Sequence, residues 1–354
     1  MMFSFLARKK DLVGLDIGAS SVKAVQLRRV GKGYELLHLG MAPLNPETIV
    51  DGVIMDGGSV ISAIQQIYQE HGIKTKDVAV AVSGHSVIVK KIRMQQMKEE
   101  ELAESIQWEA EQYIPFAIED VNLDFQILEP REGSAEMDVL LVAVKRDVIN
   151  DYLTVISSAG LNGQVVDVDA FALENAYEIS GEIPRDQTVA LVNLGAMVMN
   201  INILQRGVTE FTRDSAIGGN RYTESIQKML GLSFAQAEKL KMGTPVEGRT
   251  LSEAQPAIDM VNTELAGEIR RSMDFFRSSS QSDTIHKVVL SGGGARLPGL
   301  MNFLGQHLEV PVEVVNPLRA IKADPKKFDP EYLEFVGPQL GVAVGLALRQ
   351  VGDK

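Results

Sequence analysis

One pattern occurs twice in this chain: an apolar strand enters a short glycine-bearing turn and leaves it as a second strand. The first copy spans 12–27, with its turn at 18–21, and the second spans 189–203, with its turn at 195–196. Small residues in such a turn let consecutive backbone N–H groups approach an anion, because no bulky side chain blocks the way. Two such hairpins facing each other would hold a polyphosphate between them.

The residues after each glycine exclude two common nucleotide folds. Rossmann and P-loop sites place a helix directly after the glycines, whereas Val22, Val25 and Leu27 favour a strand. The segment after Gly195 is likewise rich in Val, Met and Ile. The P-loop pattern G-x-x-x-x-G-K-[ST] is also missing, since the only Gly-Lys pair stands at 31–32 without the required glycine before it. We therefore expect two β-hairpins.

Composition limits the class of protein. A chain of 354 residues with 45% hydrophobic content is long enough for two core-bearing lobes, one for each hairpin. A net charge of -12 argues against nucleic-acid binding, because no basic stripe is available to displace phosphate counterions. Without cysteine the chain has neither disulfides nor thiolate metal sites, and the five histidines have no metal-ligand spacing. We expect a cytoplasmic protein without a membrane-spanning segment.

The segment 85–162 has the pattern of a separate small module: a strand, a helix over 98–113, two strands and a helix over 147–158. The first of these helices opens with three glutamates at its positive dipole end and is ended by Pro115. We interpret its lone tryptophan, Trp108, as a packing residue in preference to an anchor for a partner.

The second half of the chain is predicted to hold helices over 222–229, 233–242 and 256–276. A strand at 285–290 then leads into the glycine turn 291–297, which is followed by another helix. A glycine turn between strand and helix suits the close approach of a planar base or a ribose. It is a weak signal alone, because Leu297 stands where G-x-G-x-x-G needs its third glycine.

Together these segments resemble the actin-like ATPase superfamily. Five motifs match in order: phosphate-1, connect-1, phosphate-2, adenosine and connect-2, at 15–23, 165–176, 192–199, 290–297 and 337–348. The module at 85–162 looks like the 1C subdomain found in FtsA and PilM, and 216–221 followed by 237–241 is also similar to these proteins. The segment 107–116 resembles the signature of the PilM family, cytoplasmic actin-like proteins of type IV pilus assembly.

The resemblance implies an α/β fold, the two-lobed actin-like ATPase fold that duplicates a ribonuclease H-like unit, with an FtsA-type 1C subdomain inserted in the first lobe. It also implies subdomain boundaries. Subdomain 1A takes 11–84, 163–186 and 319–350, 1C takes 85–162, 2A takes 187–224 and 284–318, and 2B takes 225–283.

The same resemblance implies a site for ATP or ADP with Mg²⁺. Asp16 would orient the metal through water, because Mg²⁺ dehydrates reluctantly and is often held by few carboxylates plus phosphates. Glu238 and Lys241 look like ribose and adenine contacts, although from their spacing alone an exposed i,i+3 ion pair is an equal alternative. The other implied contacts, to phosphates or around the base, are Gly18, Ala19, Ser20, Ser21, Lys23, Gly195, Gly218, Gly219, Gly293, Gly294 and Arg296.

One catalytic position departs from the superfamily. Phosphate-2 normally begins with an aspartate, and here that position is Asn193. An amide neither supplies negative charge nor accepts a proton, so we expect nucleotide binding with slow hydrolysis at most. Asp167 and Asp169 are the remaining candidates for a carboxylate that orients water, and an aspartate that caps the helix at Ala170 is an equal alternative.

For function, the resemblance favours an ATP-binding protein held at the inner membrane by a partner. That partner would be a PilN-like bitopic membrane protein, whose cytoplasmic peptide we expect in a groove between 85–162 and the first lobe. Other components of the pilus platform and motor, and a homo-oligomer, are compatible with this function. The alternatives are a small-molecule kinase, which Asn193 disfavours, and an FtsA-like division protein, whose membrane-binding tail is missing after connect-2.

Overall fold

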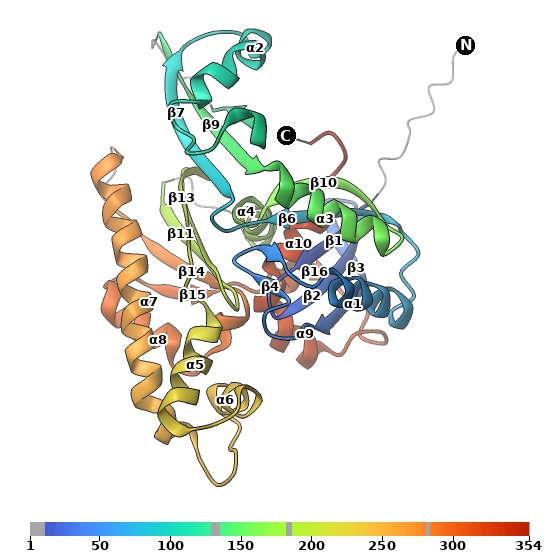
Figure 1. Ribbon diagram of the computed structural model, residues 1–354, viewed down its shortest axis with the longest axis vertical. Coiled ribbons are helices and arrows are strands. Elements are labelled where there is room, and N and C mark those ends of the chain that lie inside the picture. The colour runs from blue at the N-terminus through green and yellow to red at the C-terminus, as the bar shows by residue number, and fades with distance from the viewer. Residues whose placement is uncertain (1–10, 129–134, 182–185, 281–283, 354) are drawn as a thin grey trace.

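Two β-sheets with the same topology form the two lobes (Figure 1). The computed structural model describes residues 11–128, 135–181, 186–280 and 284–353. The first sheet has the order β10-β6-β1-β2-β3-β16, and the second has the order β13-β12-β11-β14-β15. Five strands of each sheet share one pattern, in which three antiparallel strands lie beside two parallel ones, so the duplication extends beyond the hairpins. The first sheet has β16 as an additional strand, parallel to β3.

The strand bounds confirm both predicted hairpins. The first is β1–β2 and the second is β11–β12, and each pair is antiparallel. Strands of the first sheet are β1 (Val13–Ile17), β2 (Ser21–Val30), β3 (Gly33–Pro43), β6 (Asp77–Val82), β10 (Asn162–Val168) and β16 (Ile321–Lys322). Strands of the second sheet are β11 (Thr188–Leu194), β12 (Met199–Gln205), β13 (Val208–Ser215), β14 (Lys287–Ser291) and β15 (Val312–Val314).

Helices cover both faces of the first sheet. On one face, α1 (Gly57–Glu70) and α3 (Arg146–Ser158) share a core with β1 and β6, beside a small pair β4 (Ile49–Val50) and β5 (Val53–Ile54). On the other face, α4 (Asp169–Ser180) crosses α10 (Gly341–Ala347), which follows α9 (Pro330–Val336). A β-carbon on Gly345 would lie 1.6 Å from the carbonyl oxygen of Ala172, so this close crossing of α4 and α10 requires glycine.

The second lobe contains α5 (Gly219–Leu230), α6 (Phe234–Lys241), α7 (Leu251–Ser279) and α8 (Leu300–Leu308). Helix α7 begins earlier than the predicted Pro256, because Thr250 and Glu253 form a capping box that starts the helix at Leu251. Pro256 lies inside the second turn of the helix, where only one backbone hydrogen bond is lost.

The inserted subdomain contains β7 (Val87–Gln95), β8 (Val121–Ile127), β9 (Glu136–Lys145) and α2 (Glu99–Ala110), with the sheet order β7-β9-β8. Leu102 and Ile106 of α2 pack on Val139 and Leu141 of β9 in a core of their own. Helix α3, which the sequence pattern assigned to this module, instead buries its apolar side in the first lobe. The independent part of the module therefore ends with β9, before the predicted boundary at 162.

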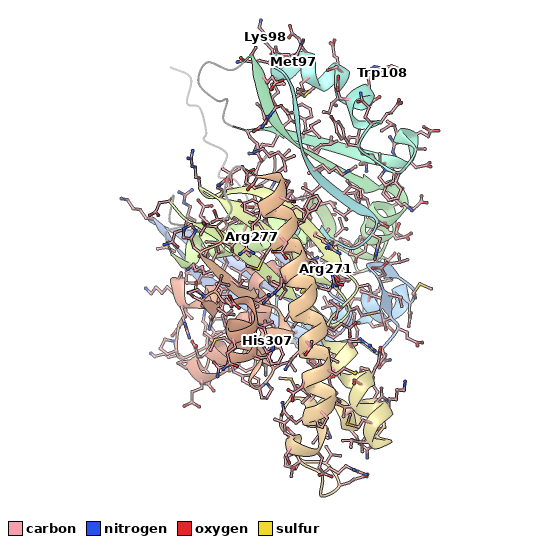
Figure 2. The ribbon with its side chains drawn as sticks, turned by 90° about the vertical axis from the view of Figure 1, so that its left-hand side faces the viewer. Met97, Lys98, Trp108, Arg271, Arg277 and His307 are labelled. Atoms are coloured by element: carbon pink, nitrogen blue, oxygen red, sulfur yellow. The ribbon has the colours of Figure 1, made fainter. Side chains whose placement is uncertain are left out.

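Two further predictions can be compared with the structure. The side chain of Trp108 is 73% exposed and lies on the outer side of α2 (Figure 2), so its interpretation as a packing residue is wrong. The boundary predicted at 186 lies at the first described residue after 182–185, and those four residues are outside the described part of the chain. No helix among the described residues is long and apolar enough to cross a membrane.

Candidate functional site

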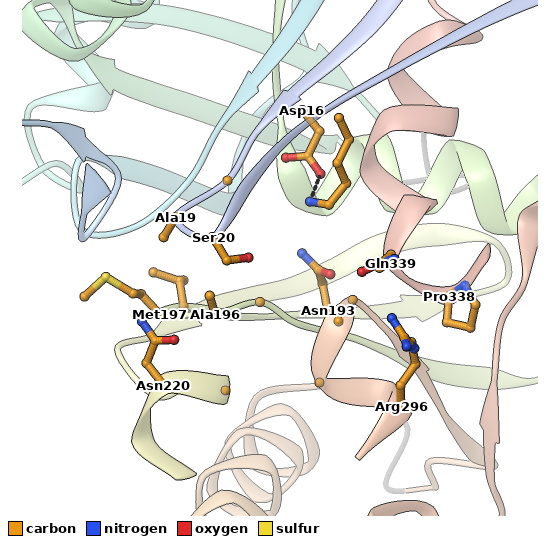
Figure 3. Close-up of a pocket in the computed structure, with 18 of the residues that line it drawn as sticks. Asp16, Ala19, Ser20, Asn193, Ala196, Met197, Asn220, Arg296, Pro338 and Gln339 are labelled. Atoms are coloured by element: carbon orange, nitrogen blue, oxygen red, sulfur yellow. Dashed lines mark hydrogen bonds and ion pairs between the residues drawn. The ribbon is translucent and has the colours of Figure 1, made fainter. Parts of the chain in front are cut away.

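The two hairpin turns face each other across a cavity of about 790 Å³ between the lobes. Figure 3 shows Asp16 and Ser20 on one side of this cavity and Asn193 and Ala196 on the other. Both turns close in the same way, since the N–H of Gly18 donates to the carbonyl of Ser21 and the N–H of Gly195 donates to the carbonyl of Val198. The site is therefore built from the same backbone device used twice.

The first hairpin brings a charged pair to the cavity. Asp16 of β1 stands directly opposite Lys23 of β2, and Nζ of Lys23 donates to Oδ2 of Asp16 over 2.8 Å. Both side chains are 13% exposed, so water screens the pair only partly. A β-carbon on Gly18 would make only ordinary contacts, the nearest at 3.5 Å, so packing within this turn does not require glycine. The turn thus presents a lysine and a carboxylate to the cavity.

The second hairpin brings an amide pair. Asn193 of β11 stands opposite Asn200 of β12, and Nδ2 of Asn193 donates to Oδ1 of Asn200 over 2.9 Å. Its turn packs tightly, because a β-carbon on Gly195 would lie 2.8 Å from the carbonyl oxygen of Val198. The start of α5 is tied to it through the N–H of Gly219, which donates to the carbonyl of Gly195. Glycine is required here by packing within the turn.

Glu238 and Lys241 of α6 lie at the cavity wall and form the i,i+3 ion pair that their spacing allowed, but the lysine of the pair is buried. Lys241 is only 4% exposed, and its Nζ donates to Glu238, Thr223 and the carbonyl of Gly219 at 2.6, 3.0 and 3.2 Å. Burial lowers the pKa of Lys241, and the Glu238 carboxylate opposes that shift. All three ammonium hydrogens are used, so Lys241 holds Glu238 in place.

The glycine turn after β14 packs against the second hairpin. Gly292 has a φ of +88°, and a β-carbon there would lie 2.4 Å from the carbonyl oxygen of Leu194. A β-carbon on Gly294 would clash with the side chain of Leu194 at the same distance. Gly293 has only Gln339 near it, at 3.9 Å, and lines the cavity. Two of the three glycines are thus required by packing, and the third leaves room beside a ligand.

Arg296 forms a flat platform with a residue of the other lobe. Its guanidinium lies 3.6 Å from the centre of the Phe335 ring, which is 60% exposed at the end of α9. A guanidinium stacked on an aromatic ring presents a planar, partly apolar surface. Such a surface suits the face of a nucleobase.

Among the connect-1 carboxylates, Asp169 lines the cavity. It is the first residue of α4, with Val168 as the N-cap, so the capping interpretation does not hold for it. Burial, and then the charge of Asp16, raises the pKa of Asp169 to about 7, while a hydrogen bond with Ser83 opposes the shift. Its proton therefore titrates in the neutral range.

Three of the sequence-predicted residues lie outside the cavity lining. Asp167 faces Arg349, whose guanidinium is 3.3 Å from its Oδ2. Ser21 supplies its carbonyl to the first turn, and Gly218 packs its Cα against Ala196, where a β-carbon would lie 2.5 Å from a carbonyl oxygen. The others that the sequence predicted do line it: Asp16, Gly18, Ala19, Ser20, Lys23, Asn193, Gly195, Gly219, Glu238, Lys241, Gly293, Gly294 and Arg296.

Sequence reasoning missed several lining residues that come from distant elements. Tyr152 reaches the cavity from α3, and burial raises its pKa well above the usual value. Phe335, Pro338 and Gln339 come from the segment around the end of α9. A tyrosine on an apolar helix face and aromatic or proline residues near a glycine carry no local sign of such a role.

Comparison with known proteins assigns the family. Residues 14–351 match the family model described as type IV pilus assembly protein PilM. The chain belongs to the PilM family. A solved structure titled as the PilM-PilN type IV pilus biogenesis complex contains a chain 32% identical to this one, with a TM-score of 0.86 and coverage of 98% of this chain and 100% of that chain. The predicted resemblance to PilM and the predicted actin-like fold are both confirmed.

More distant similarity extends to other actin-like proteins. The cell division protein FtsA of Enterococcus hirae is 24% identical over 88% of this chain and 79% of its own length. The structure of MreB5 of Spiroplasma citri bound to AMPPNP shares the fold, with 12% identity, a TM-score of 0.51 and coverage of 92% of this chain and 97% of that chain. This PilM-family chain is thus similar to the cell division protein FtsA in sequence and to MreB5 in fold.

Proposed function

We propose that this PilM-family chain works in the cytoplasm, binds ATP or ADP with Mg²⁺ between its two hairpins, and docks a PilN-like membrane protein of the type IV pilus machinery. The observation that carries the proposal is the whole-length similarity, at 32% identity, to the PilM chain of a PilM-PilN complex. An actin-like relative of the same fold bound to AMPPNP supports the nucleotide. The partner would hold the protein at the inner membrane.

The first hairpin is the proposed phosphate site. Lys23 and the turn at Gly18 would donate hydrogen bonds to the phosphate oxygens, with the ammonium as the main positive charge. Mg²⁺, when bound, supplies charge neutralisation of the phosphates. Asp16 and Asp169 are the carboxylates that line the cavity on this side. Since no cluster of three or more metal-ligating side chains occurs among the described residues, the ion would rest on few carboxylates, water and phosphate.

The ribose and base would lie between α6 and the glycine turn after β14. Glu238 is held by Lys241 and Thr223, so its carboxylate is fixed for hydrogen bonding to ribose hydroxyls. The Arg296–Phe335 platform supplies a stacking surface for adenine.

Hydrolysis in this site is proposed to be slow. Asn193 is buried and already donates to Asn200, and an amide accepts no proton from an attacking water. Asp169, with a pKa near 7, is the cavity carboxylate best suited to orient or deprotonate water. Asp167 is paired with Arg349 away from the cavity. The protein would therefore act as a nucleotide-sensitive binding partner with weak turnover, which disfavours the small-molecule kinase alternative.

The docking groove is proposed to lie between the inserted subdomain and the first lobe. The test is calorimetric titration of the cytoplasmic peptide of the PilN-like protein from the same organism, with and without Mg-ATP. Since Val87 and Val144 are directly opposed, residues 88–143 can be replaced by a short linker that leaves α3 in the core of the first lobe. We expect this deletion to abolish peptide binding and to retain ATP binding. Peptide binding to the deletion variant would place the groove elsewhere.

A further inference from the structure

A chain of side-chain hydrogen bonds leaves the cavity and crosses to the other lobe. Nδ2 of Asn193 donates to Asn200 over 2.9 Å, and Nδ2 of Asn200 donates to Oδ1 of Asp214 over 2.9 Å. The other carboxylate oxygen of Asp214 accepts the backbone N–H of Gly84 over 2.6 Å. The chain begins in the second hairpin and ends on the backbone of the first lobe, so β13 connects the two lobes at this point.

Gly84 stands at the entrance to the inserted subdomain. It joins β6 to β7, with a φ of +90°, and a β-carbon there would lie 3.0 Å from the carbonyl oxygen of Asp51. The residue before it, Ser83, lines the cavity and bonds to Asp169. The chain leaves the subdomain through α3, which also reaches the cavity. Tyr152 of α3 lines the cavity and donates to the carbonyl of Gly52 over 3.2 Å. Both connections of the subdomain thus run along the cavity wall.

The same strand holds the subdomain at a second point. Glu210 of β13 binds Lys91 of β7 through both carboxylate oxygens, at 2.9 and 2.7 Å, and Lys91 also pairs with Asp138 of β9 at 3.1 Å. Glu210 lies at an irregularity in the pairing of β13, and Asp214 lies four residues further on; both side chains reach the segment 84–91 that begins the subdomain. Figure 1 shows β7 running down from the subdomain toward β13, and the two strands are in contact.

We propose that β13 couples the nucleotide cavity to the inserted subdomain, with Asp214 as the positioning residue. The inference rests on the proposed nucleotide site. A phosphate group that draws the amide of Asn193 toward itself takes the donor away from Asn200. Asn200 then turns, and Asp214, which can only accept hydrogen bonds, loses one of its two donors. The contact between Asp214 and Gly84 changes in strength, and with it the position of β7.

Coupling of this kind is reciprocal, so anything that fixes the subdomain must change nucleotide affinity by the same factor. A partner seated against the subdomain would therefore sense the nucleotide through β13. The Lys91–Glu210 pair is then the attachment of the subdomain to β13 that does not depend on nucleotide. The Asn193–Asn200–Asp214 chain is the attachment that changes with nucleotide.

The test uses the absence of cysteine from the chain. Glu104→Cys on α2 and Arg270→Cys on α7 lie on exposed helix positions and accept spin labels. Mg-ATP is expected to change the distance between the labels in the otherwise unmodified protein. Asp214→Asn should reduce that change at least by half, with ATP affinity within about threefold of the original by calorimetry. The matched control is Arg213→Gln, the preceding position on β13, whose partner Glu268 lies in the same lobe.

The outcomes separate this inference from the proposed function. If Mg-ATP does not bind the unmodified protein, the proposed nucleotide site fails. If Mg-ATP binds and the distance does not change, or if Asp214→Asn keeps the full change, the coupling role of β13 is overturned while the nucleotide site stands. Should Asp214→Asn fail to fold by circular dichroism, Glu210→Gln replaces it. That variant keeps the Asp214–Gly84 contact but removes the fixed attachment of Lys91 to β13, so an unchanged distance response there also overturns the proposal.

Discussion

The two hairpins share one backbone and differ in chemistry. Asp16 and Lys23 occupy facing positions across β1 and β2, and Asn193 and Asn200 occupy the equivalent facing positions across β11 and β12. The first pair is ionic and lines the cavity. The second pair is neutral, joined by a hydrogen bond and continuous with Asp214 through a second one. The two hairpins thus provide equivalent positions with different proposed roles. The first binds the phosphates of the nucleotide, and the second couples the nucleotide cavity to the inserted subdomain.

The largest expected effect is on stability, and it distinguishes Gly195 of the second hairpin from Gly18 of the first. Gly195→Ala should destabilise the protein by about 2–3 kcal/mol, because the new β-carbon meets a carbonyl oxygen that is itself bonded across the turn. Gly18→Ala should change stability by no more than about 0.5 kcal/mol, since its nearest neighbours are in ordinary contact. Urea unfolding of both variants measures the difference. Equal losses would contradict the distinction between a turn whose packing requires glycine and one whose packing does not.

Asp169, beside the first hairpin, gives a second test, because burial, and then the charge of Asp16, raises the pKa of Asp169 from 3.8 to about 7. Between these values the folded protein holds a proton that the unfolded chain has lost, so this group makes stability fall as pH rises. Asp169→Asn should remove that fall. Between pH 5 and pH 8, the free energy of unfolding of the variant should rise by about 1–2 kcal/mol relative to that of the original protein. This is less than the full pKa shift implies, because one side of Asp169 faces the cavity and is partly screened by water. A pH-independent difference in unfolding free energy would refute the assignment.

Removing the Asp16 carboxylate should change ATP affinity in opposite directions with and without Mg²⁺. Asp16→Ala is expected to weaken Mg-ATP binding tenfold or more, which corresponds to about 1.4 kcal/mol, because the carboxylate that would orient the hydrated ion is lost. Without Mg²⁺, the same variant should bind ATP at least as tightly as the original, since Lys23 no longer has an internal partner. Calorimetry in magnesium and in EDTA checks both signs, with the exposed Asp11→Ala as a control.

The smallest expected effect concerns the second hairpin. Asn193→Asp, made together with Asp214→Asn so that the chain keeps a single negative charge, should raise ATP turnover about three- to fivefold and leave binding nearly unchanged, because it supplies a carboxylate that can orient water. Phosphate-release assays on the purified variant measure it. Fast turnover by the unmodified protein, or no gain in the variant, would show that hydrolysis is not limited by this position.

The parts of the molecule that were predictable from sequence are those whose signals are local. The hairpins, the inserted strands and the cavity residues of the two turns follow from alternating apolar patterns and glycine positions within a few residues. The start of α7 was misplaced because Pro256 looked like a helix start, while the capping box at Thr250 was overlooked.

The remaining errors share a physical cause, which is packing between distant segments. Helix α3 looked like part of the inserted module because it follows β9 directly, and only its burial beneath the first sheet assigns it to the lobe. Phe335 reaches Arg296 from the other lobe, and Asp214 reaches Gly84 across 130 positions of sequence. No pattern of neighbouring residues reports contacts of this kind.

The chain from Asn193 to Asp214 has a polarity, and the polarity restricts which residues can occupy its ends. Both amides donate in the same direction, and the terminal carboxylate offers only lone pairs. An aspartate at 193 would turn Asn200 around and set its carbonyl oxygen against Asp214. One negative charge therefore fits at either end of the chain but not at both. The carboxylate that the superfamily resemblance leads us to expect at position 193 has its counterpart here in Asp214, two side chains along the chain of hydrogen bonds. Chains of this fold with aspartate at 193 should carry an uncharged residue at 214.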